Sequence, residues 1–407
     1  MGGLMNPPRA WAAAMLCAGA AMASAPAQAQ EVRTRATVSA GASYGTNPFL
    51  SQVAEGSAGS GYVELAPVLQ MNSETLELAL DGTFRYQRYT KRYNDDFMAR
   101  VGASAKKRAS ERLVLSAQAD ALTSRSAVLD LVFAAPPGLP DDGGLPEPPV
   151  IDPGETGRDG RVSGFSGSFG GDYALTPVSS LFAEISSDFR YYKKEGRDYR
   201  FVALNLGYAR TLSETLSVSA NVGFSDAVYS GDVPGARIIA PAVGVTWKPG
   251  ANTELSARIG ADFTRKDVVP GLNRSTVTLA ASFAFCDRQL GGSLCLSGKR
   301  SARPTGLDGV SVVTGASLGY TSELGPYDSL SAAINYSRLD QLRSDLVPDS
   351  LGDTDLLGGS VTYRRTIADR TSIFVTPAAA KRWKKTDKRD ANLTITVGIS
   401  VTVGGRS

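Results

Sequence analysis

Ten charged residues recur inside stretches of this sequence that otherwise alternate apolar and small polar side chains, and they are the strongest candidates for chemistry. Both signs occur: the ten are Glu77, Asp81, Arg85, Arg100, Glu184, Asp188, Arg190, Arg258, Asp262 and Arg364. Inside a closed sheet such side chains could set up a transverse field or a charged constriction that selects solutes by dipole and size. The alternative is that they pair across neighbouring strands and simply stiffen the interior.

The composition argues against catalysis. The 407 residues include no histidine, which is the commonest general base and the commonest metal ligand. Nothing in the sequence marks a serine with a lysine or a carboxylate as its base. We therefore expect no enzymatic activity, no cofactor site and no metal site. The formal net charge of +3 indicates no nucleic-acid partner.

The elements that must position the ten charges are β-strands with two different faces. In the last of them, Leu393, Ile395, Val397, Ile399, Val401 and Val403 share one face, and threonine, glycine and serine residues occupy the other. A period of two over this length predicts a strand with one apolar face and one face of small polar groups. The same pattern recurs from residue 36 to the C-terminus.

Two folds compete for this pattern. A soluble sandwich also alternates, but its exposed faces carry many lysine and glutamate residues and its strands are shorter. Here the polar face is dominated by serine, threonine, glycine and asparagine, and the alternation often extends over ten residues or more. The sequence therefore predicts an all-β fold, a single closed antiparallel transmembrane β-barrel.

The number of predicted strands is about 18. The candidate at 292–300 is weak, so 16 strands is the alternative. Short connections at 72–74, 211–214, 248–252 and 367–370 alternate with longer ones at 45–59, 129–160, 229–236, 299–308 and 340–353. Barrels of the outer membrane have short periplasmic turns and long external loops. We expect the proline- and aspartate-rich segment 129–160 to be one of these external loops.

The N-terminal segment predicts the compartment. Residues 1–29 contain the apolar stretch 10–23 and end in Ala27, Gln28 and Ala29, which fit a small-x-small cleavage site. We expect this signal peptide to be removed, and residues 30–407 to form a barrel in the outer membrane of a Gram-negative cell. Cys286 and Cys295 then remain, and could close a short hairpin with a disulfide in an oxidising periplasm. Two unpaired thiols are the alternative.

Surface residues suggest contacts with the membrane. Aromatic residues gather near the predicted long-loop ends of strands, where rings suit headgroup depth; they are Tyr44, Phe84, Tyr86, Tyr191, Tyr192, Tyr229, Tyr336 and Trp383, with Trp247 at a short turn. A basic cluster at the last long loop could contact lipopolysaccharide phosphate or an anionic saccharide, or be a solvated hairpin tip; it comprises Arg382, Lys384, Lys385, Lys388 and Arg389. We expect outer-membrane lipid and lipopolysaccharide as partners.

The segment after the first strand resembles a known family. Tyr44, Asn47, Pro48 and Phe49 match the opening of outer-membrane β-barrel porins that are associated with exopolysaccharide production. The resemblance implies a barrel that passes or exports a hydrophilic solute, with polysaccharide and periplasmic export proteins as further partners. A second hypothesis is a non-conducting barrel that scaffolds a surface-polysaccharide assembly.

Overall fold

The computed structural model describes most of the chain beyond the predicted signal peptide. The described residues are 31–50, 56–91, 93–125, 160–193, 198–231, 235–269, 272–289, 291–306, 309–341, 353–384, 387–388 and 390–406. The predicted signal peptide and nearly all of the expected loop at 129–160 lie outside this set.

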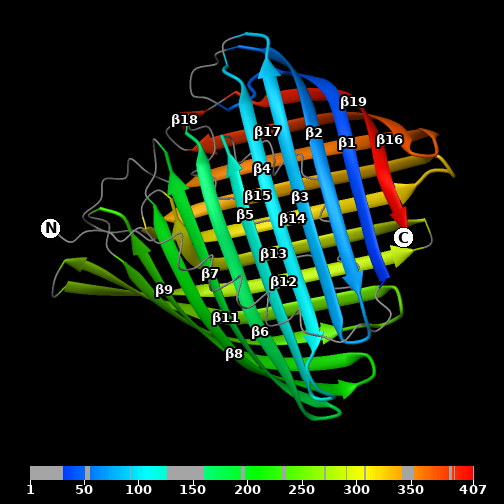
Figure 1. Cartoon of the computed structure of the whole chain (residues 1–407). Helices are drawn as coiled ribbons and strands as arrows, with labels where there is room; N and C mark the ends of the chain where they lie inside the picture. Colours follow the sequence, from blue (N-terminus) through cyan, green and yellow to red (C-terminus); the bar gives the residue numbers. More distant parts are fainter. Residues whose placement is uncertain are drawn as a thin grey trace.

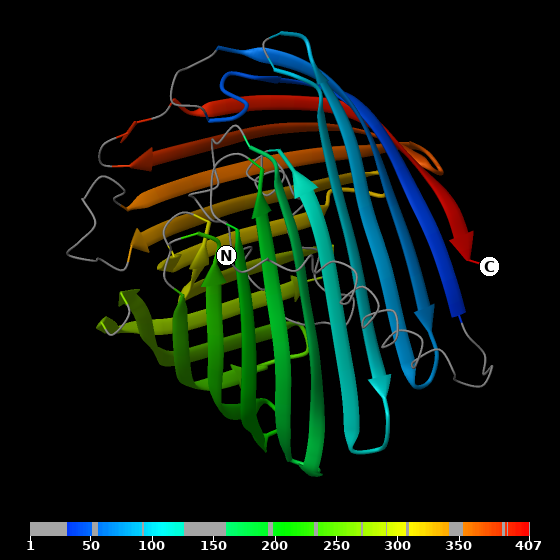
Figure 2. The same ribbon diagram turned by 60° about the vertical axis from the view of Figure 1, so that its left-hand side comes forward.

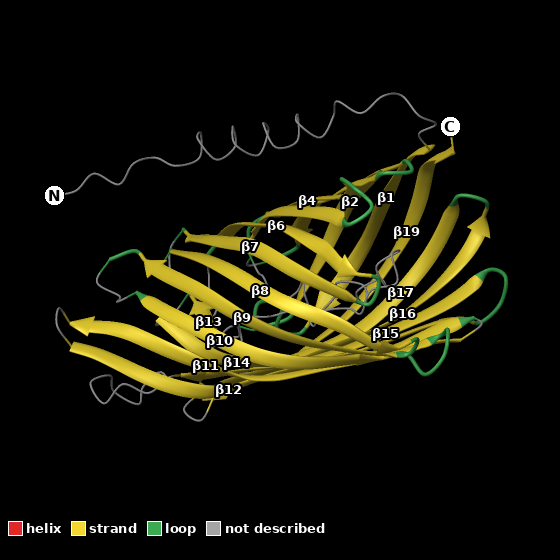
Figure 3. Cartoon of the chain, turned by 90° about the horizontal axis from the view of Figure 1, so that it is seen from below, coloured by secondary structure: helices red, strands yellow, loops and turns green. Residues whose placement is uncertain are grey.

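Strands make up almost all of the described structure, and helices are absent from it (Figures 1 and 3). The strands are β1 (Glu31–Gly45), β2 (Ala58–Asn72), β3 (Leu76–Tyr89), β4 (Asp96–Arg108), β5 (Leu113–Ser124), β6 (Val162–Thr176), β7 (Ser179–Tyr192), β8 (Tyr199–Ser213), β9 (Leu216–Tyr229), β10 (Ala236–Trp247), β11 (Thr253–Val269), β12 (Leu272–Gln289), β13 (Gly292–Thr305), β14 (Gly309–Glu323), β15 (Asp328–Gln341), β16 (Thr354–Ala368), β17 (Thr371–Lys384), β18 (Asp387–Lys388) and β19 (Asn392–Arg406).

The strands form one closed antiparallel sheet. Each long strand pairs with its neighbours in the chain, and β19 closes the ring by pairing with β1, where Thr37 lies opposite Thr402. Figure 2 shows β1 in dark blue beside β19 in red. The two-residue β18 pairs only with the end of β17, so the described part of the chain has an 18-stranded barrel. The all-β closed barrel is confirmed, and the alternative of 16 strands is wrong, because β13 pairs with both β12 and β14.

The two faces of the sheet differ as the alternation predicts. Large apolar side chains point outward and stay exposed: Ile259 is 57% exposed, Val397 54% and Val243 57%. The residues between them carry mostly small or polar side chains that face the enclosed space. A water-soluble sheet buries its apolar face, so an outward apolar face indicates a barrel with lipid around it.

The two ends of the barrel differ in their connections. At one end, which we call the short-turn end, β6–β7, β8–β9 and β16–β17 are joined by two residues each, and Glu31 and Arg406 lie there too. At the other, the long-loop end, connections such as 46–57 and 342–353 are longer. One expected long loop is wrong: within 299–308, β13 continues to Thr305 and β14 starts at Gly309.

Outward aromatic rings mark both ends. Tyr44, Tyr86, Phe97 and Tyr191 are 44–52% exposed near the long-loop end, and Tyr173, Tyr208, Trp247, Tyr320 and Tyr327 are 38–63% exposed near the short turns. The prediction that Tyr192 and Tyr229 lie at headgroup depth on the outside of the barrel is wrong. Their positions in β7 and β9 put them on the inner face, where both belong to a packed apolar cluster.

A hydrogen-bonded latch closes the ring at the long-loop end. Just after β1, the backbone N–H of Asn47 donates to Asn392 Oδ1 (3.0 Å), and its side-chain amide donates to the carbonyl oxygen of Asp390 (3.2 Å). Thr46 Oγ1 donates to the carbonyl oxygen of Ala391 and accepts from the N–H of Leu393. Asn47 and Asn392 are both almost fully buried, so these bonds are shielded from competing water.

We expect Asn392→Ala to destabilise the barrel by about 1–3 kcal/mol, because it leaves the buried N–H of Asn47 without its acceptor. The measurement is the urea midpoint of refolded protein in lipid vesicles. Thr402→Ala is the matched control, since it removes a longer hydroxyl contact (3.3 Å to Thr37) from the same strand pair. Equal midpoints for the two variants would contradict the latch.

Candidate functional site

The ten charged residues predicted from the sequence all take inward positions in their strands. Arg258, for example, precedes the outward Ile259, and Asp81 follows the outward Leu80. The structure joins two of them, Arg190 and Asp188, as an ion pair at 3.2 Å. Arg100 pairs with a residue outside the set, Asp120, at 2.7 Å.

A first cavity lies on the inner wall where β1–β3 meet β15–β17 and β19. Its volume is about 290 Å³, and hydroxyl groups dominate its lining, among them Ser39, Ser60, Thr362, Thr376, Thr394 and Thr396. Arg85 pairs there with Glu64 at 2.6 Å and lies over the ring of Tyr62. Arg364 instead donates to two serine hydroxyls, Ser372 and Ser400. These groups can hydrogen-bond water or a hydroxylated solute.

The strongest departure from a plain cylinder is the end of the β13–β14 hairpin. β13 pairs with β12 only as far as Arg300, opposite Ala281, although both strands continue. Beyond that point the N–H of Ala302 donates to Asp262 Oδ2 (2.6 Å), a side chain on the inner face of β11. The hairpin end therefore lies inside the barrel, over the inner face of β11. We call residues 301–306 and 309–312 the infolded hairpin; of these, Ser311 and Val312 also keep their pairing with β15.

Apolar contacts hold the infolded hairpin against the neighbouring strands β8–β10 of the inner wall. Ala302 and Val310 pack in a buried cluster with Tyr199, Ala227, Tyr229, Ala236 and Ile238 from β8–β10. At the tip, a Cβ added to Gly306 would fall 2.3 Å from Tyr192 Oη, so this turn touches β7. A second charged anchor is Lys266, whose Nζ donates to the carbonyl oxygen of Val310 (2.7 Å).

A second cavity, of about 500 Å³, opens beside the infolded hairpin. It is lined by the Arg100–Asp120 and Arg190–Asp188 pairs, by Asp81, and by Arg303 from the hairpin. The carboxylate of Asp81 fits over Gly102, where a Cβ would lie 2.6 Å from its oxygen. Among the described residues, neither Asp81 nor Arg303 has an ion-pair partner. The narrowed lumen thus holds two unneutralised charges of opposite sign.

The remaining predicted residues are more scattered. Glu77 lies opposite Lys106 in the β3–β4 ladder, Glu184 lies on the inner face of β7, and Arg258 has no ion pair with a described residue. Asp262 serves the hairpin rather than a solute. The basic cluster of the last long loop is described only in part, since Lys385 and Arg389 lie outside the described residues.

Sequence reasoning missed Arg303 and Lys266. The sequence does contain a signal for Arg303: Ser301, Arg303 and Thr305 alternate with Ala302 and Pro304, which continues the strand pattern into the predicted loop 299–308. Nothing in the sequence alone indicates that this strand end turns inward.

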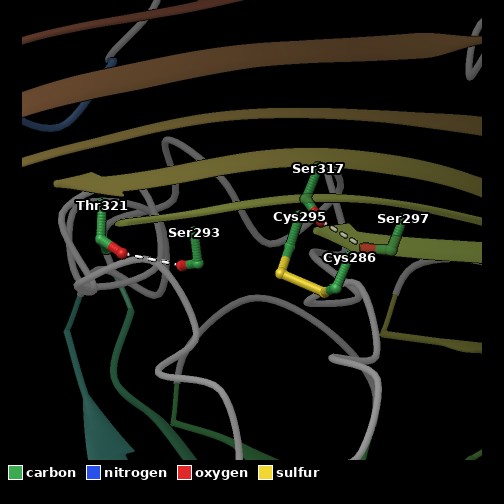
Figure 4. The surroundings of a disulfide bond; sticks show 6 residues. All are labelled: Cys286, Ser293, Cys295, Ser297, Ser317 and Thr321. Atoms are coloured by element: carbon green, nitrogen blue, oxygen red, sulfur yellow. Dashed lines mark hydrogen bonds between the residues drawn. A yellow bond between two sulfur atoms is a disulfide. The ribbon is translucent and has the colours of Figure 1, made fainter. Parts of the chain in front are cut away.

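A disulfide joins the lower part of β12 and β13. Cys286 and Cys295 are bonded, with Cα atoms 4.2 Å apart, and they lie directly opposite each other in the ladder (Figure 4). Between β13 and β14, the hydroxyl groups of Ser297 and Ser317 (2.6 Å) and of Ser293 and Thr321 (2.8 Å) are hydrogen-bonded. The bond thus links these two strands below the point where they separate.

Two other kinds of feature are absent from the described residues. No helix there is long and apolar enough to cross a membrane. No group of three or more cysteine, aspartate or glutamate side chains there could hold a metal ion.

We expect the double variant Cys286→Ser/Cys295→Ser to unfold about 2–3 kcal/mol more easily, because the bond closes a loop of about ten residues in the unfolded chain. The measurement is the urea midpoint of the oxidised protein and of the variant, each with and without reductant. The variant should not respond to reductant. Free thiols in the unreduced native protein would contradict the bond.

Similarity to known proteins was found among solved structures. No family model matches the chain, and no curated protein matches it. Among solved structures, it is similar to OccK2 (OpdF) of Pseudomonas aeruginosa in complex with glucuronate, with 13% identity, 92% of this chain and 98% of that chain covered, and a TM-score of 0.44. It is similar to OprD of the same species, with 9% identity, 92% of this chain and 95% of that chain covered, and a TM-score of 0.40. It is also similar to a BenF-like porin from Pseudomonas fluorescens, with 11% identity, 92% of this chain and 99% of that chain covered, and a TM-score of 0.43. None of these three names refers to exopolysaccharide.

Proposed function

We propose that this chain is a porin-like protein of the Gram-negative outer membrane through which small hydrophilic solutes diffuse. The observation that carries the proposal is the contrast between the two faces of a closed barrel. The outside is apolar, and the inside holds cavities lined by hydroxyl groups and charges. Such an interior replaces part of a solute's hydration shell, whereas lipid tails cannot.

Support for the membrane location comes from the outward face alone. The apolar band lies between two belts of exposed aromatic rings, an arrangement typical of transmembrane barrels. Above the band, near the long-loop ends of β13–β16, the outward face becomes charged: Arg300 bonds Asp340 at 3.1 Å, and Arg338 bonds Asp353 at 3.1 Å. This charged rim is where lipopolysaccharide would be contacted.

The solute class that the family resemblance suggests is exopolysaccharide, exported with the help of periplasmic proteins. Its support is the match at Tyr44, Asn47, Pro48 and Phe49 together with a hydroxyl-lined interior. Deleting the gene and measuring the yield and chain length of secreted polymer tests this narrower proposal. Unchanged polymer would leave the porin-like function standing and remove the export role.

A non-conducting scaffold is the second candidate, and the infolded hairpin favours it. This hairpin occupies part of the lumen and packs against β8–β10. In planar bilayers a scaffold gives no current, whereas a porin gives steady current. We infer no enzymatic step in either case, since passage by diffusion requires none.

We expect Arg303→Ala to shift ion selectivity toward cations and Asp81→Ala to shift it toward anions. Each variant leaves the other charge uncompensated, and a unit charge about 10 Å from a permeating ion in water changes its energy by about 0.4 kcal/mol, or about twofold in occupancy. The measurement is the reversal potential in a KCl gradient. Shifts in the same direction, or none in conducting channels, would contradict the assignment of both charges to the pathway.

We expect Val397→Arg to destabilise the barrel in lipid by about 2–4 kcal/mol, because it places a charge on the lipid-facing side of β19. Thr396→Arg is the matched control, since it lies at the same depth on the inner face. The measurement is the unfolding midpoint in vesicles. If the inner variant lost as much stability as the outer one, the outward face would not be the lipid-facing one.

A further inference from the structure

The β12–β13 seam is incomplete in its upper half. The two strands pair from Gln289–Gly292 up to Ala281–Arg300, yet β12 extends to Leu272 and β13 to Thr305. Over the unpaired lengths β12 stays with β11, and β13 stays with β14. We propose that the infolded hairpin is a gate with two positions: the infolded one, and a flush one in which β13 continues its ladder along β12.

The existing register specifies how the flush position would pair. Continuing the ladder by two residues puts Ala302 opposite Leu279, and by four puts Pro304 opposite Val277. The 4.2 Å between the Cα atoms of Cys286 and Cys295 is the spacing of a pair without mutual backbone hydrogen bonds. The alternate pairs, including Ala281–Arg300 and its continuation Leu279–Ala302, therefore exchange backbone hydrogen bonds.

The side chains suit the flush position as well. Ala302 and Pro304 would join Leu279 and Val277 on the outward face, where those two side chains are now 56% and 62% exposed. Arg303 and Thr305 would remain on the inner face. Proline donates no backbone hydrogen bond, so this end of the ladder would be held more weakly than a regular one.

Side chains of β11 stabilise the infolded position, where the hairpin no longer pairs with β12. Asp262 accepts the N–H of Ala302, which is the same N–H that would pair with the carbonyl oxygen of Leu279 in the flush position. Lys266 binds the carbonyl oxygen of Val310, and Val310 itself is buried against β8–β10. Leaving the infolded position breaks two charge-assisted bonds, while reaching the flush one forms new ladder bonds. Exchange between the two positions therefore keeps most backbone groups paired.

The gate would control both width and charge of the pathway. In the infolded position the hairpin occupies part of the lumen, over the inner face of β11, and presents Arg303 to the second cavity. In the flush position it would join the wall and widen the lumen. The motion itself does not depend on the proposed porin-like function, so the two can fail separately.

Cysteine cross-linking tests the motion directly. In the flush register Thr276 lies opposite Thr305 as a pair without mutual hydrogen bonds, whereas in the infolded position Thr305 is buried next to the tip. Thr276→Cys/Thr305→Cys should therefore form a disulfide on oxidation in bilayers, detected by mass spectrometry alongside the native bond. Ala284→Cys/Ser297→Cys is the matched control, since this pair is already opposed. Cross-linking of the control but not of the test pair would overturn the gate.

Releasing the anchors gives an independent test. Asp262→Ala/Lys266→Met should speed cross-linking of the test pair and raise single-channel conductance, while Ser256→Ala, also inward on β11, should change neither. Conductance and cross-linking both unaffected by the anchor variant would overturn the gate. Cross-linking without any current in any variant would support the gate and contradict the proposed porin-like function.

Discussion

The structure depends on one constraint, which is that backbone N–H and C=O groups surrounded by hydrocarbon must be paired within the protein. A single antiparallel sheet meets it only by closing, because any free edge leaves a row of unpaired groups. The pairing of β1 with β19 completes this closure over almost the whole length of both strands. The buried Asn47–Asn392 contact then fixes the long-loop end of the same seam, where the loop after β1 would otherwise leave polar groups unpaired.

The same constraint explains the unusual part of the interior. Where β13 leaves β12, its backbone loses a strand partner, and the carboxylate of Asp262 on β11 accepts one N–H of β13. Lys266, also on β11, donates to a carbonyl oxygen of the adjoining β14. The narrowing of the lumen is thus a consequence of how one strand end satisfies its hydrogen bonds. Arg303 enters the second cavity because it lies on that strand end, so the charge of the lumen is coupled to the local hydrogen bonding of the wall.

The sequence is a reliable guide to every feature that depends on side chains alternating between the two faces of a strand. It predicts the closed barrel, the number of strands and the inner face of residues such as Arg258 and Asp81, because alternation alone decides which side a strand residue takes. It fails where position depends on distant strands. Tyr229 follows the pattern of a rim aromatic but packs inside against the hairpin, and the segment 299–308 has the composition of a loop but is mostly strand. Alternation contains no information about a strand end that bends inward.

The hydrogen-bonded latch gives a structural reason for part of the family resemblance. Among the four residues that carry the resemblance, Asn47 makes the buried contacts next to β19. Phe49 packs on Tyr89 and Tyr93, with ring centroids 5.5 and 4.6 Å apart. Packing of the loop after β1 accounts for these residue types, because a buried amide can hold such a loop to the last strand and a ring can pack it onto the end of β3. A match at these positions therefore supports a shared way of closing a barrel more strongly than a shared solute. Evidence on the solute has to come from side chains that face the lumen, and in this chain those are the hydroxyl-lined first cavity and the opposed charges of Asp81 and Arg303.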